Sequence, residues 1–92
     1  MALTFEWDAK KAKINLLKHK VSFEEASSAF GDDLSITIED PLHSDNENRL
    51  ILIGKSIYFK TLVVVHIEKI KSIRIISARK ATKKEQIFYE ES

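Results

Sequence analysis

The segment RIISARKATKKE, residues 74–85, holds five of the fifteen lysines and arginines of the chain. It begins with the alternation of a β-strand and ends in T-x-x-E, the capping box that starts a helix. Lys83 and Lys84 would lie in the first turn of that helix, where the positive end of the dipole makes each cation cost roughly 0.3–1 kcal/mol. The same turn presents unpaired N–H groups and is a natural phosphate site. The two lysines therefore either help to bind an anion or simply extend into solvent, and this turn supports both interpretations equally.

Charge is unevenly distributed along the whole chain, although the net charge is only +1. Residues 21–48 contain eight carboxylates and no lysine or arginine, whereas residues 49–84 contain ten lysines and arginines and one carboxylate, Glu68. Such asymmetry is typical of a protein that meets a polyanion or a complementary protein partner.

The predicted elements that must position these charges follow the order β-α-α-β-β-β-β-α. The strands are predicted at residues 3–7, 34–39, 49–53, 57–68 and 72–77. The helices are predicted to start after the capping residues Asp8, Ser22 and Thr82. A run of helices followed by a run of strands favours an α+β fold, with the helices packed on one face of an antiparallel sheet.

Alternation within the predicted strand 57–68 assigns its residues to the two faces of that sheet. The set that includes Phe59, Val63 and Val65 is almost wholly apolar, so it is assigned to the helix-covered face. The opposite, open face would carry His66, as a partly exposed residue, together with three cations. These cations are Arg49, Lys60 and Arg74, and they make the open face a plausible polyanion platform.

Length and composition narrow the class of protein. All 92 residues are predicted to form one domain, since a chain of this size can bury about 60% of its unfolded surface. Cysteine is absent, and the charged first twenty residues lack the apolar core of a secretory signal, so a reducing cytoplasm is expected. No run approaches the roughly 20 apolar residues of a membrane span. Because carboxylates do not cluster with histidines at ligand spacing, neither a metal nor another cofactor is predicted.

Four blocks of the sequence, in this order, resemble the BrnT toxin family from residue 5 to residue 89. They are FEWDAKKAKINLLKHKVSFEEA, Asp40 with HSDNENR, Gly54, and IRIISARKATKKE with the later Tyr89. The resemblance implies a RelE-like ribonuclease that acts as the toxin of a type II toxin–antitoxin pair. It also implies inhibition by a BrnA-type antitoxin, dimers within the complex, and contact with DNA only through the antitoxin. The family commonly has another basic residue where this chain has Gln86.

RNA cleavage through a 2′-hydroxyl needs a base, an acid and cations around the phosphorane, and it needs no metal. Arg79 is the first candidate, as the guanidinium that grips the scissile phosphate, although a surface ion pair would also explain it. Lys18 and His19 match the K-H pair of the family, and His19 can act as acid or base, whereas capping the helix C-terminus is the simpler interpretation. Glu85 is either the base or the residue that orients Arg79, and its capping role alone would account for it.

The other cations are expected to hold the RNA backbone. The predicted RNA-binding residues are Arg49, Arg74, Lys80, Lys83 and Lys84. Arg49 matches the E-x-R pair of the family with Glu47, a pair that a structural salt bridge would explain equally well. Trp7 is expected to pack beside the first helix rather than to stack on a base. A competing interpretation is a nucleic-acid-binding module that keeps this platform but has lost turnover, and Gln86 favours it.

Overall fold

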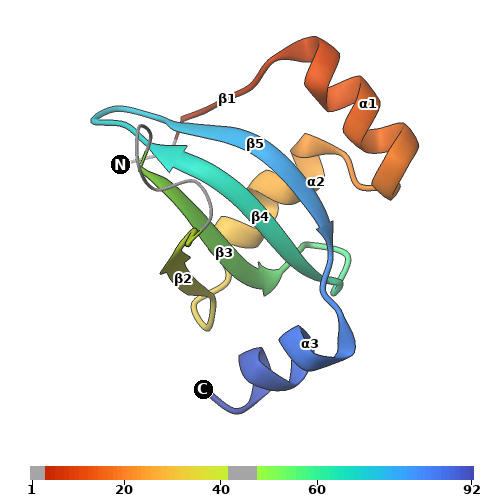
Figure 1. Cartoon of the computed structure of the whole chain (residues 1–92), viewed down its shortest axis with the longest axis vertical. Coiled ribbons are helices and arrows are strands. Elements are labelled where there is room, and N and C mark those ends of the chain that lie inside the picture. Colours follow the sequence, from red (N-terminus) through yellow and green to blue (C-terminus); the bar gives the residue numbers. More distant parts are fainter. Residues whose placement is uncertain (1–3, 42–47) are drawn as a thin grey trace.

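The computed structural model describes residues 4–41 and 48–92, and its elements follow the predicted order (Figure 1). The strands are β1 (Phe5–Glu6), β2 (Ile36–Glu39), β3 (Arg49–Lys55), β4 (Thr61–Glu68) and β5 (Ile73–Lys80). The helices are α1 (Ala9–His19), α2 (Phe23–Ser28), which continues into the 3₁₀ turn η1 (Ala29–Gly31), and α3 (Lys83–Glu90). The predicted α+β class is confirmed. Within the described ranges, no helix has both the length and the apolar character needed to cross a membrane.

The five strands form one sheet in the order β1-β5-β4-β3-β2. Neighbouring strands from β2 to β5 are antiparallel, as predicted, and the two-residue β1 adds a parallel edge to β5 through the pair Phe5 and Ile73. Parallel pairing of β1 with β5 requires a long crossover connection. The segment between the two strands contains α1, α2 and three strands, which is long enough.

All three helices begin where the sequence predicts. The Asp8 side chain accepts a hydrogen bond from the Lys10 N–H, Ser22 from the Glu25 N–H, and Thr82 from the Glu85 N–H. Each cap satisfies a donor that the first turn of a helix would otherwise leave unpaired. The three N-termini are therefore fixed by local sequence.

The main core lies between the sheet and the pair α1 and α2. Leu62 and Val64 of β4 are fully buried there against Phe23, which is also fully buried. The Trp7 ring meets the Phe23 ring edge-on, with 5.9 Å between the ring centroids, and it packs against this core. Tryptophan thus joins the N-terminal segment to the core through a favourable edge-to-face contact.

The predicted assignment of the faces of β4 is wrong. Leu62, Val64 and His66 point to α1 and α2, and the exposed fraction of His66 is 0%. Val63 points to the other face, where it packs with Ile53. Both alternating sets are largely apolar because both faces of β4 are covered, so alternation alone could not distinguish them.

The helices also do not share one face, which corrects the predicted packing. Tyr89, the one buried residue of α3, belongs to the cluster of Ile53 and Val63, on the face opposite α1 and α2. Figure 1 shows α3 at the end of the sheet, away from α1. The Tyr89 hydroxyl donates to the Asp32 carboxylate, which raises the pKa of Tyr89 to about 12. This bond anchors α3 to the segment after η1.

Asn15 joins α1 to β5. Its amide nitrogen donates to the carbonyls of Val21 (3.0 Å) and Ala78 (2.8 Å), and its oxygen accepts from the Ala78 N–H (3.1 Å). Asn15 is buried, so these three backbone groups have no access to water as a substitute partner. The C-terminal part of α1 is consequently held beside the second half of β5.

Replacing Asn15 with alanine should lower the free energy of unfolding by about 2–4 kcal/mol, because buried backbone groups lose their partners. Urea unfolding of Asn15→Ala measures this change. Lys13→Ala, on the exposed side of the same helix, is the matched control and should change stability by less than about 0.5 kcal/mol. Equal losses in the two variants would show that the side chain of Asn15 does not hold α1 in place.

His66 is a titratable group in the centre of the core. Its ring meets the Phe30 ring edge-on at a centroid distance of 4.8 Å, and its Nδ1 lies 3.2 Å from the Val64 carbonyl oxygen. Burial lowers the pKa of His66, although the Val64 carbonyl and Glu68 oppose that shift. The folded state therefore favours the neutral imidazole.

The stability of the fold should decrease as the pH falls below about 6.5, the ordinary pKa of histidine. Below that pH the unfolded chain binds a proton that folded His66 resists, so the free energy of unfolding falls by up to about 1.4 kcal/mol per pH unit. Denaturant unfolding between pH 7 and pH 5 should give a shallower pH slope for His66→Leu than for the wild type. Identical slopes would contradict this account.

Candidate phosphate-binding site

Arg79 and Glu85 form a two-point ion pair at the junction of β5 and α3. The Arg79 Nη1 lies 2.7 Å from one carboxylate oxygen of Glu85, and Nη2 lies 2.8 Å from the other. Nη1 also donates to the Lys80 carbonyl at 3.2 Å. The Arg79 side chain remains 41% exposed, so the arginine is held by Glu85 but can still be reached from solvent.

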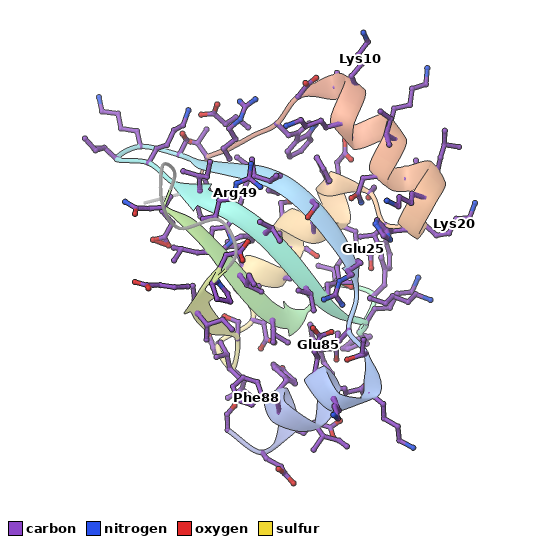
Figure 2. All side chains as sticks on the ribbon, viewed as in Figure 1. Lys10, Lys20, Glu25, Arg49, Glu85 and Phe88 are labelled. Carbon is purple, nitrogen blue, oxygen red and sulfur yellow. The ribbon has the colours of Figure 1, made fainter. Side chains whose placement is uncertain are left out.

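The Glu85 carboxylate performs two tasks at once. The oxygen that receives Arg79 Nη1 also accepts the Thr82 N–H at 2.8 Å, which completes the predicted capping box. Figure 2 places Glu85 at the start of α3, next to the end of the strands. Hydrogen bonds from Arg79 and then Thr82 lower the pKa of Glu85 to about 2. A carboxylate this acidic is a poor proton acceptor near neutral pH, so the geometry favours the orienting interpretation of Glu85 over the base.

Three lysines lie close to Arg79 and Glu85 in the sequence. Lys80 ends β5, and Lys83 and Lys84 occupy the first turn of α3; all three side chains are exposed. Among residues 4–41 and 48–92, no salt bridge joins any of them to a carboxylate. Glu85 is the acidic residue of this first turn, and its charge partly offsets theirs. The predicted run of cations is thus present between the end of β5 and the first turn of α3.

Lys18 and His19 lie in a separate recess. They line it together with Ile76 and Ser77 of β5, near the end of α1 that Asn15 holds. Ser77 precedes Arg79 by two residues on the same face of β5, which corresponds to roughly 7 Å along the strand. No hydrogen bond or ion pair between described residues joins this recess to Arg79. The two parts are neighbours along β5 rather than members of one preformed pocket.

Arg49 and Arg74 occupy the other end of the sheet. Both flank Ile67 of β4, whereas Arg79 is opposite Val63, four residues or roughly 13 Å away. Arg74 donates to Glu6 at 3.1 Å. Glu47, the predicted partner of Arg49, lies outside the described residues. Arg74 and Arg79 are thus paired with carboxylates at opposite ends of β5, and the structure does not bring them together around one position.

The predicted platform is accordingly only partly present. Arg49 and Arg74 share a face with Arg79, but His66 is buried on the opposite face. Lys60 belongs to the turn before β4 and not to the strand. In the part of the chain that the structure describes, no group of three or more histidine, aspartate or glutamate side chains is placed to hold a metal ion.

A family model of ribonuclease toxins, "BrnT, of type II toxin-antitoxin system", matches residues 7–85. The chain belongs to the BrnT family. Its fold is similar to that of the crystal structure of the Brucella abortus ribonuclease toxin BrnT, with a TM-score of 0.59 and 24% sequence identity. That match covers 89% of this chain and all of the Brucella chain. None of the curated proteins matches this BrnT-family chain.

Two contacts that support the candidate site were missed in the sequence analysis. Asn15 was detectable, because it follows Ala12 by three residues and therefore places an amide on the apolar side of α1. The bond between Tyr89 and Asp32, which are 57 residues apart, left no local signal. Both contacts fix the elements that carry the candidate residues: α1 for Lys18 and His19, and α3 for Glu85.

The ion pair of Arg79 with Glu85 should make the stability of the fold depend on pH in the acid range. Because the pKa of Glu85 drops from 4.5 to about 2 on folding, its contribution to stability is complete above pH 4.5 and is lost as the pH falls towards 2. Glu85→Gln should therefore lose less stability than the wild type over this range. Glu24→Gln, at an exposed position of α2, should keep the wild-type slope. If Glu85→Gln also kept it, the carboxylate would not be bound as described.

Proposed function

We propose that this BrnT-family chain is a metal-independent endoribonuclease that cleaves RNA by attack of a 2′-hydroxyl on the adjacent phosphate. It acts as the toxin of a type II pair in the cytoplasm, and a BrnA-type antitoxin neutralises it. The observation that supports this proposal is the ion pair of Arg79 with Glu85, which presents a fixed cation among Lys80, Lys83 and Lys84.

Arg79 retains the donors that a phosphate requires. A guanidinium has five N–H groups, and three of them are used by Glu85 and the Lys80 carbonyl. The Nε–H and the second hydrogen of Nη2 remain, and they project from the same edge of the planar group. That edge matches two oxygens of a phosphate and stabilises the charge that develops on them in the transition state. Glu85 is the positioning residue that aims this edge.

Proton transfer is assigned to the neighbouring recess. His19 is the acid or base, since an imidazole can donate or accept a proton, and Lys18 supplies further positive charge to the phosphorane. Substrate RNA would bridge the distance along β5 between this recess and Arg79. Arg49 and Arg74, at the far end of the same face, would hold a more distant part of the RNA backbone.

The proposed partners follow from the family. The antitoxin binds the toxin as a protein partner, the complex contains a toxin dimer, and DNA is reached only through the antitoxin. Expression of this chain alone is expected to arrest growth, and co-expression of the antitoxin is expected to restore it.

A second function is a nucleic-acid-binding module without turnover. The observation that favours it is that Glu85 already neutralises the candidate Arg79, which weakens the electrostatic attraction for a phosphate. Gln86 adds to this, since the family commonly has a cation there. Such a module would bind RNA with a steep dependence on salt and leave it intact.

The cleavage assay separates the two functions. Purified protein incubated with single-stranded RNA in EDTA should yield fragments, and Arg79→Ala should be slower by a factor on the order of 100 to 1,000. Arg79→Lys should not restore the rate, because an ammonium lacks the two-donor edge. Lys71→Ala, exposed in the turn between β4 and β5, should cleave at the wild-type rate. Intact RNA in every condition, with or without EDTA, would overturn the enzymatic proposal.

A further inference from the structure

The turn between β3 and β4 presents three large apolar residues to solvent. Ile57 and Tyr58 are each 64% exposed, and Phe59 is 83% exposed. The sequence pattern placed these residues inside a strand, but β4 begins only at Thr61. Three consecutive exposed apolar residues form a contiguous patch, which is typical of an interaction site.

Phe59 also has an unfavourable backbone conformation. Its φ angle is 62°, in the left-handed region where glycine or asparagine is the usual residue of a turn. A bulky residue there costs free energy that a glycine would not, and such conformations cluster at functional sites. The chain therefore keeps an aromatic ring at a position where stability favours its removal.

Several hydrogen bonds hold this turn in place. The Ser56 hydroxyl donates to the buried Glu25 carboxylate at 2.8 Å, and the Ser56 N–H donates to the Lys60 carbonyl at 2.9 Å. The Phe59 N–H donates to the Ser56 carbonyl at 2.9 Å, and the Ile57 N–H to the Ser28 hydroxyl at 3.0 Å. The ring of Phe59 is thus presented from a fixed support rather than from a mobile tip.

Phe59 lines a recess of about 270 Å³ whose other walls are mostly cationic or polar. The lining residues are Lys55, Phe59, Lys60, Thr61, Lys80, Ala81 and Gln86. Within the described ranges, neither Lys60 nor Lys80 forms a salt bridge. Lys80, Ala81 and Gln86 belong to the junction of β5 and α3, so the recess lies at the junction that also carries Arg79 and Glu85.

We infer that this recess is a nucleotide subsite in which Phe59 stacks on a base of single-stranded RNA while Lys60 and Lys80 bind the flanking phosphates. An exposed ring beside unpaired ammonium groups is the combination that single-stranded nucleic acid requires, since every base has a stacking face and every linkage a negative charge. An apolar segment of a protein partner would instead bury these ammonium groups without a counter-charge. The subsite rests on the proposed function, because it would hold the nucleotide next to the one cleaved at Arg79.

Phe59→Gly tests the subsite by separating stability from binding. Glycine relieves the backbone conformation, so the free energy of unfolding should stay the same or rise. Affinity for a 2′-O-methylated single-stranded RNA, which cannot be cleaved, should fall roughly 10- to 100-fold, the loss expected for one stacked base. Fluorescence anisotropy with a labelled oligonucleotide measures this affinity.

Three comparison variants make the result specific. Phe59→Trp should keep the wild-type affinity, because it keeps a stacking face. Ile57→Ala, in the same turn but outside the recess, should also bind like the wild type. Lys60→Ala should weaken binding and lower the salt dependence of the affinity by about one counterion.

Wild-type affinity in Phe59→Gly, with RNA cleavage by the wild type intact, would overturn the subsite and leave the proposed function standing. Loss of antitoxin binding alone in Phe59→Gly would overturn it as well, and would assign the turn to a protein interface. Wild-type protein that neither binds nor cleaves RNA would overturn both proposals together.

Discussion

The candidate site depends on one carboxylate, that of Glu85. It accepts hydrogen bonds from the Thr82 backbone and from two nitrogens of Arg79, so the same group fixes where α3 begins and where the guanidinium points. Glu85 also places a negative charge in the helix turn that carries Lys83 and Lys84. Without it, repulsion among the cations and the helix dipole would oppose the arrangement that the proposed phosphate site needs.

Around this junction, both faces of the sheet are covered at the end where β5 meets α3. The fully buried Leu62 and Val64 face α1 and α2, and Val63 between them faces Tyr89 of α3. Because β4 is packed on both sides, Arg79 and the turn with Phe59 are supported by a rigid strand rather than by loops. The side chains proposed to meet RNA need such support to hold their geometry in the absence of a ligand.

Local signals explain what could be predicted from the sequence. The caps Asp8, Ser22 and Thr82 and the order of elements depend on short patterns, and the structure reproduces them. The faces of β4 could not be assigned, because apolar residues alternate with other apolar residues, and His66 consequently proved to be a core residue. Within the predicted site, the T-x-x-E pattern predicts that Glu85 lies in the first helical turn close to Arg79. The distance between Arg79 and His19 depends instead on how α1 packs against β5. The conformation of Phe59 has no signature in the residue types around it.

The most direct test of the phosphate site is to observe the arginine side chains while RNA binds. NMR spectra of the arginine Nε–H groups, recorded during titration with the 2′-O-methylated RNA, report each guanidinium separately. The account predicts that the Arg79 resonance shifts more than those of the other arginines, and that its shift reaches a plateau when the protein is saturated with RNA. An unchanged Arg79 resonance with large shifts at Arg49 and Arg74 would place the phosphate at the other end of the sheet and contradict the account.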